Sequence, residues 1–196
     1  MKKKLLILAM LVICATSIAS GTLAYFTAEE TAHNVITSSG VDIKIEEWQE
    51  TDEGLIPYPK EKPIQVMPNT KVSKIVTVKN EDADSFIRVG YEIILKDNEG
   101  NVMNISPETL ESIVSVSLNE VVWLRKESDD YWWYYNKNVS GGEVTEPLFT
   151  EVVFDGPNMT NEYQNCIVEV IVNAQAVQTA NNGDSVMKAE GWPEEE

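Results

Sequence analysis

The chain has 196 residues and a formal net charge of −17, with 32 acidic residues against 15 basic ones. Its length fits one domain, and such an acidic chain lacks the basic face that binding to nucleic-acid phosphates requires. The same charge argues against electrostatic adhesion to an anionic membrane surface.

The N-terminus has the layout of a secretory signal peptide. It starts with lysines at positions 2–4, continues with an apolar run over residues 5–13, and ends in the short residues Thr22 and Ala24. We expect cleavage after Ala24, so that the mature chain begins at Tyr25. An uncleaved membrane anchor is disfavoured, because a spanning helix needs about 20 apolar residues and this run is shorter. A lipid anchor is disfavoured because the cysteine of the signal lacks a lipobox context.

Period-two alternation of apolar and polar residues predicts three strands in the first half of the mature chain. A segment rich in proline and glycine is expected to form a loop between the first two. The strands are residues 41–46, 72–79 and 85–95, the last with a bulge at Gly90, and the loop is residues 50–63.

One helix is predicted after these strands. Ser106 is a suitable N-cap, Pro107 suits the first helical position, and Glu108 places an acid in the first turn. The helix should run to about Val114, where residues of high β propensity make its end uncertain.

The second half of the chain predicts a hairpin, a further strand and a long alternating strand. Many short strands, frequent turns and one helix indicate a mainly β fold, an antiparallel β-sandwich or jelly roll, preceded by the signal-peptide helix. The strands are residues 121–125, 131–135, 148–154 and 166–178. The expected organisation is a signal peptide (1–24), an N-terminal segment (25–38), the sandwich (39–180) and an acidic C-terminal tail (181–196).

The residue types that carry chemistry are sparse. The chain has one histidine, His33, whereas zinc sites usually need three or four His, Cys or carboxylate ligands. Cys166 is the one cysteine of the mature chain, and a buried inert thiol is favoured over a disulfide between chains. Residues 97–101 resemble a calcium loop but lack the EF-hand order, so a hairpin turn is favoured. We therefore expect no enzyme activity, no metal and no cofactor.

An aromatic cluster at Trp132, Trp133, Tyr134 and Tyr135 is unusual. Flat rings of this kind stack on sugars or dock apolar partners, so these four residues are candidate binding aromatics. The alternative is strand alternation, with one set of rings in the core and the other set in need of cover, which a partner subunit could provide.

The N-terminal motifs resemble the TasA/camelysin family of Gram-positive bacteria. Gly-Thr-Leu-Ala-Tyr-Phe-Thr at 21–27 is similar to the family's signal-peptide end, and Ser-Gly-Val-Asp-Ile at 39–43 to the start of its first strand. Leucine at 23 stands where an aromatic residue is usual. Weaker similarities occur at 67–70, 76–80 and 174–178. The BsaA-like branch, which forms pilus-like surface polymers, is the best match.

This resemblance implies a secreted jelly-roll subunit that polymerises into biofilm-matrix or cell-surface fibres. A SipW-type signal peptidase would release it, so the chain would contact the membrane only transiently, through its signal peptide. The N-terminal segment, residues 25–38, would pair as a donor strand within the next copy of the chain, with Phe26, Val35 and Ile36 as its anchors. Such a head-to-tail contact does not close and grows a filament.

Two other functions remain as alternatives. One is a monomeric secreted adhesin or carbohydrate-binding module that uses the aromatic strand. The other, which the resemblance to camelysin implies, is a metalloendopeptidase; no matching ligand set is found in the sequence.

Overall fold

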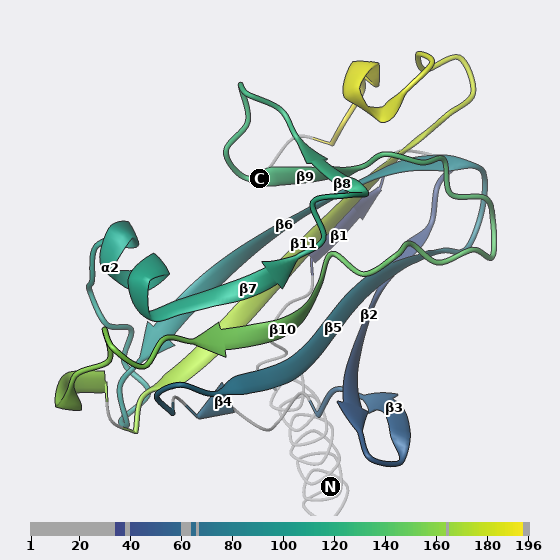
Figure 1. Cartoon of the computed structure of the whole chain (residues 1–196). Helices are drawn as coiled ribbons and strands as arrows, with labels where there is room; N and C mark the ends of the chain where they lie inside the picture. The colour runs from purple at the N-terminus through teal and green to yellow at the C-terminus, as the bar shows by residue number, and fades with distance from the viewer. Residues whose placement is uncertain (1–33, 38–39, 60–63, 66, 164, 194–196) are drawn as a thin grey trace, which may run out of the picture. The chain divides into compact units, whose positions relative to one another are not determined.

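The computed structural model describes residues 34–37, 40–59, 64–65, 67–163 and 165–193. Within these residues the chain forms two sheets packed face to face, with one short α-helix (Figure 1). The predicted mainly β fold, an antiparallel sandwich with one short helix, is confirmed. The signal peptide lies outside the described residues.

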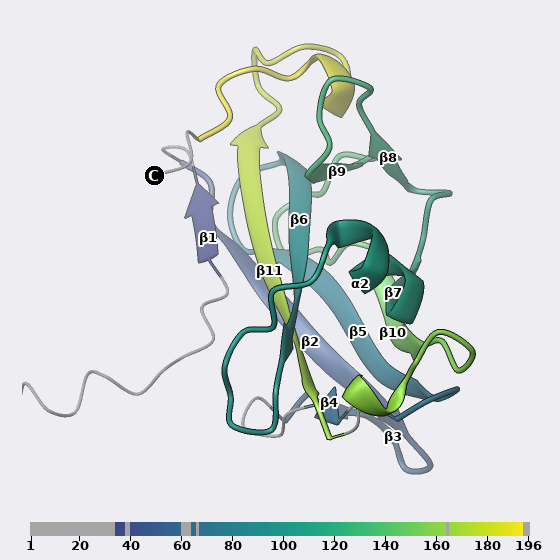
Figure 2. The same ribbon diagram turned by 90° about the vertical axis from the view of Figure 1, so that its left-hand side faces the viewer.

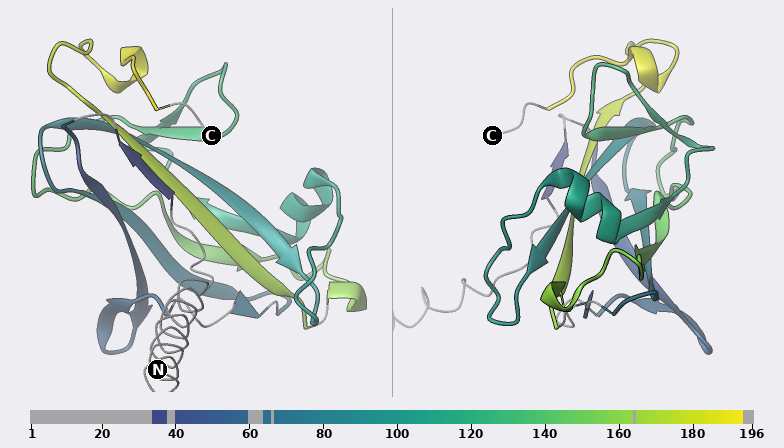
Figure 3. Two further views of the ribbon diagram at one scale, coloured as in Figure 1. Left: turned by 180° about the vertical axis from the view of Figure 1, so that it is seen from behind. Right: turned by 60° about the vertical axis from the view of Figure 1, so that its left-hand side comes forward.

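The first sheet has the strand order β1–β11–β6–β9–β8, and β4 pairs with the same edge of β11 as β1 does. All of its pairings are antiparallel except β1 with β11, which is parallel. Figures 2 and 3 show β1 lying alongside β11 at the edge of the sheet. The strands are β1 (Asn34–Thr37), β4 (Ile64–Gln65), β6 (Ser85–Lys96), β8 (Trp123–Arg125), β9 (Trp132–Tyr135) and β11 (Ile167–Gln178).

The second sheet is antiparallel, with the order β3–β2–β5–β10–β7. One of its strands, β3, lies inside the segment predicted as a loop. It pairs with the end of β2 from Trp48 opposite Pro57 to Thr51 opposite Gly54, so the two strands form a hairpin. The strands are β2 (Ile43–Thr51), β3 (Gly54–Pro57), β5 (Lys71–Asn80), β7 (Val114–Leu118) and β10 (Phe149–Phe154).

The core fills the space between the two sheets. Alternate residues of the long strands point inward, as their period-two pattern predicts. The apolar side chains that are at most 1% exposed include Val76, Val78, Ile87, Val89, Trp123, Leu148, Phe149, Val152, Val172, Ala174 and Ala176. The long strands therefore form because each buries one apolar face against the other sheet.

The predicted helix is confirmed as α2 (Pro107–Ile113). The Ser106 hydroxyl accepts a hydrogen bond from the Thr109 backbone N–H at 3.2 Å, and Pro107 occupies the first turn. The helix ends at Ile113 because Val114 begins strand β7. Two 3-10 turns, η1 (Asn161–Tyr163) and η2 (Val186–Lys188), complete the regular elements.

The bulge predicted at Gly90 does not occur. The register between β6 and β11 runs without a shift from Ser85 opposite Gln178 to Lys96 opposite Ile167. Gly90 serves a different purpose, because a Cβ at this position would overlap the ring of Tyr131. The glycine thus makes room for the close approach of the Tyr131 ring rather than adding a residue to the strand.

Candidate functional site

The candidate donor segment reaches the described part of the chain as β1. Its four residues pair in parallel with β11, from Asn34 opposite Asn173 to Thr37 opposite Ala176. β11 pairs with β6 along its whole length on its other side. β1 is therefore an end strand of the first sheet, and the rest of the sheet does not depend on it for pairing.

Most of the other residues proposed for this function lie outside the described residues. These are the cleavage residues Thr22, Ala24 and Tyr25, the anchor Phe26, and His33. The anchors Val35 and Ile36 fall within β1, opposite Ala174 and Gln175 of β11.

The β11 residues that meet β1 are tightly enclosed. Ala174 and Ala176 are fully buried in the main core, and Gln175 is 1% exposed. The Gln175 side-chain oxygen accepts hydrogen bonds from Nη2 of Arg88 at 2.6 Å and from its Nε at 3.0 Å. A charge-assisted, two-point contact of this kind fixes the orientation of both side chains.

The aromatic strand β9 places its rings on both faces of the first sheet. Trp133 and Tyr135 belong to the core between the sheets. Trp132 and Tyr134 belong to a second apolar cluster, together with Phe86, Val177, Val186 and Ala189. All four β9 rings are less than 10% exposed. Their burial does not support their interpretation as a carbohydrate- or partner-binding platform, because no broad ring face is open to a ligand.

The cover over the outer rings comes from the chain's own C-terminus. We call residues 182–193 the C-terminal strap; they lie within residues 181–196, which the sequence predicts to be an acidic C-terminal tail. The strap contains η2, and Val186 and Ala189 are buried against the second cluster. Figure 3 shows this segment returning over the end of the first sheet. A lone Trp192 in a polar stretch was the sequence signal for this packing.

Arg88 joins the strap to the sheet. Its guanidinium carbon lies 4.4 Å from the ring centroid of Trp132 and 4.7 Å from that of Trp192. Tyr134 packs edge-to-face on Trp192 with centroids 5.8 Å apart. Arginine stacked on indole rings in a desolvated setting contributes on the order of 2 kcal/mol. The contribution of Arg88 was not predicted from the sequence, although Arg88 stands out there as a single cation inside an apolar strand.

Asp129 completes this polar network. Its carboxylate accepts hydrogen bonds from the Tyr134 hydroxyl at 2.6 Å and from the backbone N–H groups of Tyr131 and Trp132. Burial raises the pKa of Asp129, but these bonds and the charge of Arg88 outweigh it, so the pKa is lowered overall. Burial, and then the bond to Asp129, raise the pKa of Tyr134. The network is structural, since its groups satisfy one another.

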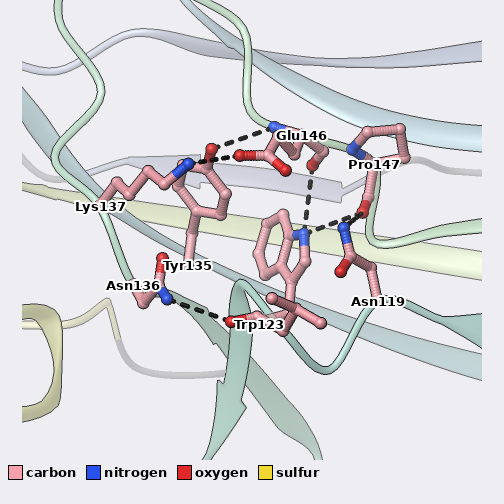
Figure 4. A network of polar contacts seen from close by, with 8 residues as sticks. Asn119, Trp123, Tyr135, Asn136, Lys137, Glu146 and Pro147 are labelled. Atoms are coloured by element: carbon pink, nitrogen blue, oxygen red, sulfur yellow. Dashed lines mark hydrogen bonds and ion pairs between the residues drawn. The ribbon is translucent and has the colours of Figure 1, made fainter.

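A second polar network connects the aromatic hairpin, formed by β8 and β9, to the loop before β10 (Figure 4). The Trp123 indole N–H donates to the carbonyls of Glu146 and Pro147, each at 3.1 Å. The Glu146 backbone N–H donates to the Tyr135 hydroxyl at 3.2 Å, while its carboxylate pairs with Lys137. Here too the aromatic polar groups bind the chain itself.

The remaining candidates for chemistry have structural partners. Cys166 is 3% exposed and its thiol contacts the Met103 sulfur at 3.4 Å, while burial raises its pKa. Asp97 caps a hairpin turn by accepting the backbone N–H groups of Glu99 and Asn101. Among the residues that the structure describes, no group of three or more His, Cys, Asp or Glu side chains could hold a metal ion.

Within the described part of the chain, no helix has both the length and the apolar character needed to cross a membrane. Comparison with known proteins found no matching family model, no matching curated protein and no matching solved structure.

Proposed function

We propose that this chain is a secreted structural subunit that assembles head-to-tail into extracellular matrix or cell-surface fibres. Each copy would donate its N-terminal strand to the first sheet of the next copy. The observation that carries this proposal is β1 itself, a four-residue parallel strand at the edge of β11.

The strand order makes β1 separable from the domain. β1 lies in the first sheet, whereas β2, the next strand in the chain, lies in the second. Among the described strands, β1 pairs with β11 alone, so its departure leaves every other strand pairing of the two sheets in place. An exchanged β1 would make with a neighbour's β11 the same main-chain contacts that it makes with its own, which is why such exchange costs little free energy.

The acceptor in this proposal is the edge of β11 from Asn173 to Ala176. Main-chain hydrogen bonds along that edge would supply affinity, and the alternation of side chains would set the register. A SipW-type signal peptidase would act first, because the donor end stays tethered at the membrane until the signal is removed.

The first test is whether the secreted chain forms fibres, as seen by negative-stain electron microscopy. We expect fibres from the chain that begins at Tyr25, and monomers from one that lacks residues 25–38. A secreted chain that stays monomeric for days at high concentration would contradict the proposal.

The second test locates the acceptor. Two variants, Val35→Cys and Ala174→Cys, each with Cys166→Ala, are mixed before assembly and then oxidised. We expect disulfide-linked dimers, because positions 35 and 174 are register partners. The matched control mixes Val35→Cys with Val172→Cys, which lies two residues, about 7 Å, along the same strand, and should give few dimers. Fibres without dimers from the first mixture would place the acceptor elsewhere.

A further inference from the structure

The C-terminal strap is a closed loop with an apolar inner side. The Asn182 side chain accepts the Glu190 backbone N–H at 2.8 Å and donates to the Glu190 carbonyl at 3.0 Å. The Trp192 indole N–H donates to the Ala189 carbonyl at 3.1 Å. These bonds close the strap on itself, as in a compact surface loop.

The strap covers a face that the sheet would otherwise expose. Beneath it lie Phe86, Trp132, Tyr134 and Val177, each no more than 7% exposed. Three of these side chains are large aromatics, and an open patch of this size is unusual on a monomeric domain. The strap therefore stabilises the outer face of the first sheet in the isolated subunit.

The strap and β1 are both linked to Gln175 of β11, the strap through Arg88 of β6 and β1 through strand pairing. On the outer face, the Trp192 ring stacks on the Arg88 guanidinium, and this guanidinium donates a hydrogen bond to the side-chain oxygen of Gln175. At the edge, the register places Gln175 opposite Ile36 of β1. A continuous chain of contacts thus leads from Trp192 through Arg88 and Gln175 to the strand that β1 pairs with.

We propose that the C-terminal strap is a clamp that controls how readily β1 leaves β11. With the strap in place, Arg88 holds Gln175 and keeps the 173–176 edge in regular strand geometry, so β1 stays paired. When the strap lifts, Arg88 loses one of its two indole rings and the edge loosens. The two chain ends are thereby coupled through one strand. The consequence for assembly rests on the proposed function, whereas the coupling itself does not.

The test is amide hydrogen exchange by NMR on the isolated monomeric chain. In Trp192→Ala we expect the amides of β1 to exchange about tenfold faster, corresponding to a local loss of about 1.4 kcal/mol. Amides of the second sheet, such as those of Val76 and Val152, should keep their rates. Arg88→Lys, which keeps the charge but loses the two-point contact with Gln175, should act in the same direction.

The matched control is Arg125→Lys, because Arg125 also lies over an indole, that of Trp133, at 5.5 Å. It should leave β1 exchange unchanged. Faster exchange in the strap with unchanged exchange in β1 would overturn the clamp, as would a uniform rise across both sheets. If Trp192→Ala does not fold, Arg88→Lys against Arg125→Lys decides the question.

This experiment separates the two proposals. A chain that forms fibres but shows no coupling overturns the clamp alone. A chain that shows the coupling but never forms fibres overturns the fibre function alone.

Discussion

Glu47 and Lys74 form a salt bridge between neighbouring strands β2 and β5. Their side chains are 6% and 5% exposed, and the carboxylate oxygen lies 2.5 Å from the ammonium nitrogen. The ammonium also lies 4.1 Å from the ring centroid of Tyr58. Burial, followed by the charge of Glu47, raises the pKa of Tyr58 to about 12. These residues depend on one another, because each charge is shielded from water.

Removing one member of this pair should be costly. We expect Glu47→Ala to lower the free energy of unfolding by about 3–5 kcal/mol, because it leaves a buried ammonium without its carboxylate. Urea unfolding at neutral pH measures this loss. The same variant should also lower the pKa of Tyr58, as read by ultraviolet titration.

The exposed pair of Lys71 and Glu151 provides the control. Their side chains are 62% and 38% exposed, so Glu151→Ala should cost less than about 1 kcal/mol. Equal losses in the two variants would show that burial does not decide the strength of these pairs.

At the scale of single elements, α2 depends on its N-cap because it has only seven residues. Ser106→Ala removes the acceptor for the Thr109 N–H and should cost about 1 kcal/mol in unfolding free energy. Ser112→Ala is the matched control, because its hydroxyl donates to a carbonyl within the helix and competes with the backbone rather than capping it. A loss in Ser112→Ala as large as that in Ser106→Ala would contradict this assignment.

The elements that the sequence predicted well are those whose pattern is set by the core. β5, β6 and β11 alternate because one face meets the other sheet, and α2 carries its capping signal locally. β3 was missed because all four of its residues are exposed. No burial imposes a pattern on them, and the strand exists through its pairing with β2.

The candidate site was only partly predictable, for a similar reason. The aromatic hairpin was visible in the sequence, but what covers it was not. That cover depends on a contact between Arg88 and Trp192, which are more than a hundred positions apart. Local propensity carries no information about such a pair, and the polar composition after residue 180, with its acidic end, predicted a C-terminal tail over residues 181–196 instead.

At the scale of the whole molecule, charge opposes association. A chain with a net charge of −17 repels its own copies. We expect fibre assembly, followed by light scattering, to accelerate as ionic strength rises from about 0.01 M to about 0.15 M, because the Debye length falls from about 30 Å to about 8 Å. Slower assembly in salt would indicate that attractive charge contacts hold the fibre together.

The parallel direction of β1 on β11 has a consequence for any polymer built by exchanging it. Each subunit would meet the next through two different surfaces, a projecting strand and a receiving edge, in one fixed orientation. The polymer would then be directional, with one terminus that offers a strand and another that offers an edge. A truncated chain without residues 25–38 could accept the strand offered at the first terminus, but it has no strand of its own to donate. Small amounts of it would therefore stop growth at that terminus.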